Sequence, residues 1–143
     1  MRIYPLSEGS FSIDSTKVFI PFEGDIQNRP TGSILVQVQP FVVVTENDII
    51  LLDTGLGYFN NQGILQIHAN LMAIGIDPSS VTKVFLSHLH KDHSGGISYL
   101  HPQHQERFIS FPYATYYIQK REYDLALQSK SASYISDQIN ILE

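Results

Sequence analysis

The stretch Ser87-His88-Leu89-His90-Lys91-Asp92-His93-Ser94-Gly95-Gly96 places three histidines and an aspartate within six positions. It follows the apolar run Val84-Phe85-Leu86, which predicts a buried strand that ends where the polar stretch begins. Neutral imidazole and carboxylate are good ligands for zinc and similar divalent ions, and the flanking glycines let backbone pass close to them. The stretch therefore indicates a catalytic metal site rather than a polar surface loop.

The spacing of the four side chains suggests how they share metal ions. His88 and His90 are two residues apart, so in extended backbone they project the same way and can bind one ion. Asp92 and His93 follow at a spacing that suits a second, neighbouring ion. Two ions that share a bridging water lower its pKa towards neutrality and polarise a carbonyl or phosphoryl oxygen. Lys91 points out of this cluster on spacing grounds and is assigned no ligand role.

Whole-chain properties narrow the class of protein. A chain of 143 residues that is 43% hydrophobic and 16% charged predicts one folded domain over residues 1–143. The net charge is −5 and the basic residues are scattered, so we expect a small-molecule substrate rather than nucleic acid or an anionic membrane. There is no cysteine, so any metal must use His, Asp or Glu. Without an apolar run of about 18 residues or a basic-then-apolar leader, we expect a cytoplasmic location.

The pattern along the chain predicts mixed α/β structure around the histidine stretch. Residues 1–22 read as short strands, and a longer strand over 33–44 is interrupted at Pro40, which marks a bulge, an edge or a bend. Ile49–Leu52 reads as a returning strand that is buried on both faces and ends at Asp53. A helix over 64–74 and a strand over 81–87 complete a βαβ element, in which sites gather at the carboxyl ends of the strands.

Beyond the glycines, the pattern predicts a polar loop over 99–106 and a strand over 114–118. A helix over 120–128 and a weaker helical tail over 129–143 follow.

Residues 87–96 resemble the His-x-His-x-Asp-His signature of metallo-β-lactamase-fold hydrolases. Residues 51–55 are similar to the segment that precedes this signature, and residues 111–118 resemble the strand after it. Gly9-Ser10-Phe11 and Pro40-Phe41 most resemble the branch that contains acyl-homoserine lactonases.

The resemblance implies an α/β (α+β) chain that forms the N-terminal half of an αββα sandwich. It implies that His88 and His90 bind the first metal, and that Asp92 and His93 bind the second. The expected cofactor is Zn²⁺, up to two ions, with iron or manganese as alternatives. Asp92 is also the expected catalytic residue. Asp53 is expected at the cleft floor, hydrogen-bonded within the ligand loop, where such carboxylates orient ligand imidazoles.

The sequence also departs from the family pattern. Complete members carry three further ligands, a His in a Gly-His-rich loop, a bridging Asp and a late His, and nothing after His93 matches them. We therefore expect a domain truncated before its C-terminal half, with two family-type ligands per ion where catalytic zinc usually has three. A sheet face left uncovered favours a homodimer, since large exposed apolar patches mark interfaces.

Two functions follow from these expectations. The first is metal-dependent hydrolysis of an ester, lactone, thioester or amide by a metal-bound hydroxide. The alternative is a non-catalytic fragment that oligomerises and binds metal weakly or not at all, so the sequence alone leaves open whether the chain is an enzyme.

Other residues have simpler interpretations. His68 is expected to be a packed, hydrogen-bonded side chain on the first helix. His101 and His104 are expected to be solvated loop residues rather than ligands. Tyr116 and Tyr117 are expected in the core or at an interface. Asp53-Thr54-Gly55 also resembles the aspartic-protease motif, but that interpretation leaves the histidine stretch unexplained.

Overall fold

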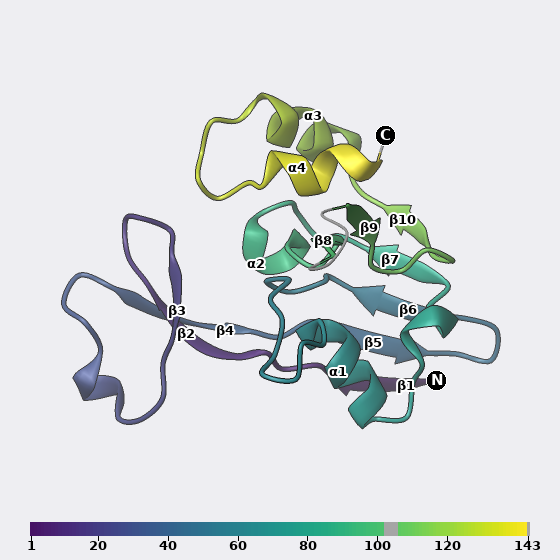
Figure 1. Ribbon diagram of the computed structural model, residues 1–143, viewed down its shortest axis with the longest axis horizontal. Coiled ribbons are helices and arrows are strands. Elements are labelled where there is room, and N and C mark those ends of the chain that lie inside the picture. Colours follow the sequence, from purple (N-terminus) through teal and green to yellow (C-terminus); the bar gives the residue numbers. More distant parts are fainter. Residues whose placement is uncertain (102–105, 143) are drawn as a thin grey trace.

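The computed structural model describes residues 1–101 and 106–142 (Figure 1). The strands are β1 (Arg2–Pro5), β2 (Gly9–Ile13), β3 (Phe19–Pro21), β4 (Ile34–Val38), β5 (Phe41–Val44), β6 (Ile49–Leu52), β7 (Lys83–Phe85), β8 (Ser98–Leu100), β9 (Arg107–Ile109) and β10 (Thr115–Tyr117). The α-helices are α1 (Gln66–Ala73), α2 (Lys91–Ser94), α3 (Lys120–Gln128) and α4 (Ser136–Ile139), and short 3-10 turns span Ile26–Asn28, Pro78–Ser80 and Asn140–Leu142.

The main sheet has five strands in the order β1-β5-β6-β7-β10. β6 and β7 are parallel and are connected through α1, which confirms the predicted βαβ element. Parallel strands bring their carboxyl ends to one edge of a sheet. Asp53 directly follows β6 and the histidine stretch follows β7, so both segments leave the sheet at the same edge.

One face of the main sheet forms the core. A row of partners in register across four strands lies on this face: Val42, Leu51 and Val84 are fully buried, and Tyr116 is half-buried against the core. Helices cover the row: Ile67 and Leu71 of α1, Ala126 of α3 and Ile139 of α4 belong to the same buried cluster. In Figure 1, α1 lies beside the sheet and α3 and α4 lie together above α2.

The neighbouring row of the same sheet is exposed. Its members are Phe41, Leu52, Phe85 and Tyr117, and each is between 37% and 42% exposed. Phe85 and Tyr117 stack with their ring centroids 4.5 Å apart. We call these four side chains the open row. The prediction that Ile49–Leu52 is buried on both faces is wrong, because Leu52 is 38% exposed and only Leu51 of this strand is fully buried.

A second sheet of three strands, in the order β3-β2-β4, projects from the main sheet (Figure 1). We call residues 9–38, which contain this sheet, the arm. The arm continues the β1–β5 ladder through hydrogen bonds from Leu6 N to Pro40 O and from Glu8 N to Val38 O. Residues 6–8 here face only residues 39 and 40, so one extra residue forms a bulge. Of the bulge, edge or bend predicted at Pro40, the structure shows a bulge, with its extra residue in the segment opposite Pro40.

The predicted helices match to different degrees. α3 has the predicted bounds, whereas α1 is shorter than the predicted helix and ends before Gly75, whose positive φ of 79° suits a helix terminus. The predicted loop over 99–106 is wrong for Tyr99 and Leu100, which belong to β8 and pair antiparallel with β9, while residues 102–105 lie outside the described residues. Among the described residues, no helix has the length and apolar character needed to cross a bilayer.

Candidate metal centre

Two loops interlock at the sheet edge and form the frame of the site. Thr54 N donates to His93 O at 2.7 Å, and Gly96 N donates to Gly55 O at 3.3 Å. The backbones approach so closely that a Cβ atom on Gly57 would overlap the carbonyl of Gly95. Only glycine permits this approach. Glycines in both loops therefore allow the histidine stretch to lie against the end of β6.

The histidine stretch turns into the short helix α2 immediately after His90. Leu89 is fully buried and anchors the turn, while the Ser94 hydroxyl donates to Leu89 O at 2.9 Å. Side chains from the C-terminal helices fix the backbone further. The Glu122 carboxylate accepts from Leu89 N at 2.9 Å, and Gln138 Nε2 donates to Gly95 O at 2.6 Å.

Asp53 is the side chain that orients the loop. Its Oδ1 accepts from Ser87 N at 2.7 Å, and its Oδ2 accepts from the Ser87 hydroxyl at 2.8 Å. Oδ2 also lies 2.8 Å from His93 Nδ1. Asp53 itself has a positive φ of 62°, which an aspartate adopts only at a cost and which turns it out of β6 toward the loop. The expected hydrogen bonds of Asp53 within the histidine loop are therefore present.

The four predicted donors lie close together. The ring centroids of His88 and His93 are 4.1 Å apart, and those of His88 and His90 are 4.7 Å apart. His93 Nε2 lies 3.4 Å from an Asp92 carboxylate oxygen. The fold thus brings together three imidazoles and one carboxylate, with Asp53 behind them.

The charges around His93 favour a cation. Hydrogen bonds to Asp53 and then to Asp92 raise the pKa of His93 to about 9, against the opposing effect of burial. Burial lowers the pKa of His88, and the neighbouring His93 and His90 lower it further. For Asp92, burial acts to raise the pKa, but the hydrogen bond and charge of His93 outweigh it and the pKa is lowered. A proton and a divalent metal ion compete for the same imidazole nitrogen.

The donor chemistry fits zinc, while the number of donors is small for a complete site. Imidazole and carboxylate are standard zinc ligands, and Asp53 on Nδ1 leaves His93 Nε2 directed at the side of Asp92. Within residues 1–101 and 106–142, however, no group of three or more such side chains is arranged to hold a single ion. The described residues therefore bring potential metal donors together without placing three of them around one point.

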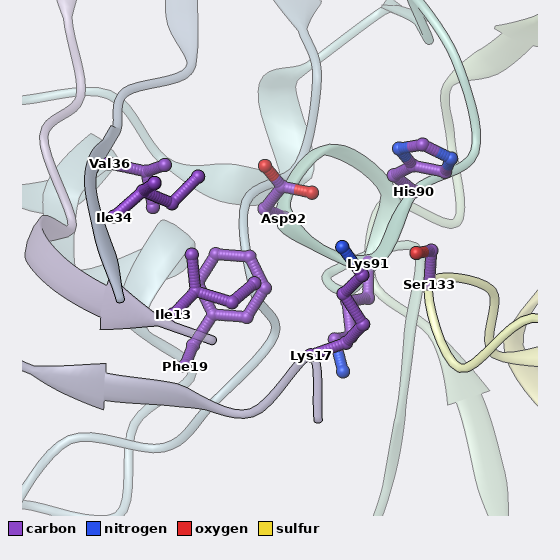
Figure 2. Close-up of a pocket in the computed structure, with 9 residues that line it drawn as sticks. All are labelled: Ile13, Lys17, Phe19, Ile34, Val36, His90, Lys91, Asp92 and Ser133. Carbon is purple, nitrogen blue, oxygen red and sulfur yellow. The ribbon is translucent and has the colours of Figure 1, made fainter. Parts of the chain in front are cut away.

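A pocket of about 180 Å³ opens beside these donors (Figure 2). His90 and Asp92 lie on the side of the histidine loop, and aliphatic side chains of the arm lie across from them. Lys17, Lys91 and Ser133 also line the opening. A smaller pocket of about 90 Å³ is lined by Asp53, Asp92 and His93 together with residues 37–40.

The family model described as the metallo-beta-lactamase superfamily matches residues 34–142, which contain the whole centre. The chain belongs to the metallo-β-lactamase superfamily. A curated member, the N-acyl homoserine lactonase AttM of Azorhizobium caulinodans, is 43% identical over 58 residues, which are 41% of this chain and 18% of that protein.

Solved metallo-β-lactamase-like structures resemble the chain over nearly its whole length. AidC, a dizinc quorum-quenching lactonase solved with a product, is 26% identical with a TM-score of 0.64, covering 90% of this chain and 45% of AidC. A probable metal-dependent hydrolase from Staphylococcus aureus is 17% identical with a TM-score of 0.67, covering 97% and 56% of the two chains. At 17% identity, the likeness to the Staphylococcus aureus structure shows the fold alone. The chain thus spans about half the length of these structures.

The other residues considered from the sequence lie outside the centre of this metallo-β-lactamase chain. His68 lies 2.9 Å from Ser110 O through Nε2 and packs against Phe111, as expected for a packed histidine. His101 contacts the ring of Phe108, and His104 lies outside the described residues. Tyr116 is half-buried against the core, and Tyr117 belongs to the open row.

Sequence reasoning missed the residues that hold the metallo-β-lactamase loops from a distance. These are Glu8, whose carboxylate accepts from Leu56 N at 2.7 Å, together with Glu122 and Gln138. Each lies more than 30 residues along the chain from the backbone group that it contacts. No local pattern could have found them, because their partners are backbone atoms whose position only the fold determines.

Proposed function

We propose that the chain carries part of the active site of a metal-dependent hydrolase that cleaves an ester, lactone, thioester or amide. The observation that carries the proposal is the convergence of His88, His90, Asp92 and His93 at the carboxyl ends of two parallel strands. The printed names of the relatives support it, because AttM is called a lactonase and AidC a dizinc lactonase.

The residues divide the work between binding metal and orienting ligands. His88 and His90 would hold one zinc ion, and Asp92 and His93 the other, with Asp92 as the carboxylate nearest the pocket. Asp53 accepts from His93 Nδ1, which fixes the tautomer that leaves Nε2 free for a metal. When bound, such ions lower the pKa of water towards neutrality and polarise a substrate carbonyl. The aliphatic wall of the arm excludes water from one side of the pocket.

Metal content and hydrolysis can be measured together on the purified chain. We expect bound zinc and chelator-sensitive hydrolysis of a panel of esters and lactones near neutral pH. His90→Ala and Asp92→Ala should each abolish binding of one ion, because each removes one of only two proposed ligands for that ion.

The matched control is Asp124→Ala, which removes an exposed carboxylate on α3 that pairs with Lys120. It should leave metal content unchanged. If His90→Ala and Asp92→Ala also leave metal content unchanged, the metal site lies elsewhere.

A second function is favoured by the absence of a three-ligand group from the described residues. In this alternative, the chain is a non-catalytic member of the family that associates through the open row and binds metal weakly. Purified protein that is metal-free and inert toward the whole ester and lactone panel would support it over hydrolysis.

A further inference from the structure

The pocket beside the centre has two chemically different sides (Figure 2). Ile13 of β2 and Ile34 and Val36 of β4 form an apolar wall. On the other side, Lys17 and Lys91 line the same opening and lie alongside each other, with one ammonium group near Asp92 and the other farther from it. A pocket of this kind suits a ligand with an apolar part and a negatively charged part.

Lys91 is held at the opening without an acidic partner. Its backbone N donates to Ser133 O at 2.8 Å, and its Nζ lies 5.7 Å from the ring centre of Phe19, over the face of the ring. Within the described residues, no carboxylate lies within 4.0 Å of its ammonium group, whereas Lys83 and Lys120 each have one. A cation over an aromatic ring keeps its charge available to a ligand.

Lys17 reaches the pocket from a strained turn. Its φ is 61°, in the left-handed region where glycine or asparagine is favoured. The turn is closed by the bond from Lys17 N to Asp14 O at 3.1 Å, and the Asp14 carboxylate accepts from both the backbone N and the hydroxyl of Thr16. Strained residues of this kind cluster at active sites and ligand-binding sites. Lys17 also lacks a carboxylate partner among the described residues.

We propose that Lys17 and Lys91 bind an anionic group, a carboxylate or a phosphate, on a substrate whose apolar chain lies along Ile13, Ile34 and Val36. This assignment rests on the proposed function, which supplies the bond that is cleaved, and adds the class of substrate. Lys91 and Lys17 determine which substrate binds, and neither takes part in bond cleavage.

Binding of three six-carbon probes tests the assignment without requiring turnover. Hexanoate, hexyl phosphate and hexanol are titrated into the full chain, with and without added zinc, and affinities are measured by NMR chemical shifts. We expect at least one anionic probe to bind about tenfold more tightly than hexanol, as a charge-assisted contact predicts. A larger gain for hexanoate identifies a carboxylate, and a larger gain for hexyl phosphate identifies a phosphate.

Variants assign the preference to the two lysines. Lys91→Met should reduce the anion preference to about twofold or less in both metal conditions, while Lys91→Arg should retain it. Lys120→Met, on α3, is the matched control and should change nothing. Lys17→Gly should also weaken anion binding, yet raise the urea midpoint, because glycine relieves the left-handed conformation. If Lys17 had only a structural role, its replacement would not weaken anion binding while raising the urea midpoint.

The outcomes separate this assignment from the proposed function. Equal binding of hexanol and both anions, or an anion preference that survives both Lys91→Met and Lys17→Gly, overturns the assignment. In parallel, hydrolysis of p-nitrophenyl hexanoate is compared with that of mono-p-nitrophenyl adipate, its anionic counterpart. Lysine-dependent anion binding without hydrolysis of either ester supports the assignment and contradicts the proposed function. Metal-dependent hydrolysis with no anion preference supports the proposed function and contradicts the assignment.

Discussion

Glu8 shows how a single buried carboxyl can hold an active-site loop. It is only 7% exposed, its Oε2 accepts from Leu56 N, and its Oε1 has no hydrogen-bond partner among the described residues. The carboxyl lies against Gly55, where a Cβ atom would overlap it. Burial raises the pKa of Glu8 to about 7, although the hydrogen bond from Leu56 opposes the shift.

This raised pKa predicts a pH-dependent stability. Between pH 4.5 and about 7 the folded protein keeps a proton on Glu8 that the unfolded chain releases, so the free energy of unfolding falls as pH rises through this window. Glu8→Gln removes the titration. We expect the variant to be more stable than the parent at pH 8 by up to about 3 kcal/mol, and similar to it at pH 5. Urea denaturation at the two pH values measures the difference.

The comparison between parent and variant isolates Glu8 from other titrating groups, such as His93. Glu46→Gln, in the exposed turn between β5 and β6, is the control and should leave the slope with pH unchanged. A parent and a Glu8→Gln variant with the same pH slope would show that Glu8 has an ordinary pKa in the folded protein.

At the scale of elements, the site depends on two loops whose backbones touch. Gly57 has a φ of 73° and faces the carbonyl of Gly95, so alanine there would be both strained and in collision with backbone. Gly63 has nearly the same φ, 74°, but nothing lies within 4 Å of the position of its Cβ. The pair therefore separates the cost of the conformation from the cost of the contact.

We expect Gly57→Ala to be far more destabilising than Gly63→Ala. The left-handed conformation should cost about 1–2 kcal/mol at both positions, and the overlap should add about 1–3 kcal/mol at Gly57 alone. Urea denaturation of the two variants gives the difference directly. Equal losses of stability would mean that the two loops separate easily and that their contact does not fix the site.

Local sequence patterns predicted the elements that depend on local physics. α3 has the predicted bounds over Lys120–Gln128, and the βαβ order follows from hydrophobic periodicity. The β8–β9 hairpin was missed because its strands are three residues each and carry little alternation. The donors themselves lie within six positions and were predictable, whereas Glu8, Glu122 and Gln138 act on backbone atoms far along the chain. Such contacts depend on tertiary folding, which a single sequence does not display.

At the scale of the whole molecule, the open row is an exposed apolar feature of the main sheet. Phe41, Leu52, Phe85 and Tyr117 lie in register across four strands, so their exposed parts form one continuous apolar band. Contiguous apolar surface of this kind marks an interface. We propose that a second copy of the chain covers it, in keeping with the homodimer expected from the sequence.

Association through the open row should be weakened by polar substitution within it. The double variant Leu52→Thr and Phe85→Thr places residues with high strand propensity at both positions and removes the large apolar surface. We expect light scattering after size exclusion to give a dimer for the parent at micromolar concentration and a monomer for the double variant. Leu125→Gln, which removes an exposed leucine on α3, should leave the dimer intact. A parent that is strictly monomeric and well folded would contradict the proposal.

The bulge between β1 and β2 divides the molecule into two parts with separate tasks. The donors and the loops that hold them belong to the main sheet, whereas the apolar wall of the pocket belongs to the arm. Because the extra residue at 6–8 accommodates the change of direction, we expect the wall to tolerate substitution with little movement of the donors. Grafting residues 9–38 from a relative should then change the ligand preference while the metal-binding residues stay in place.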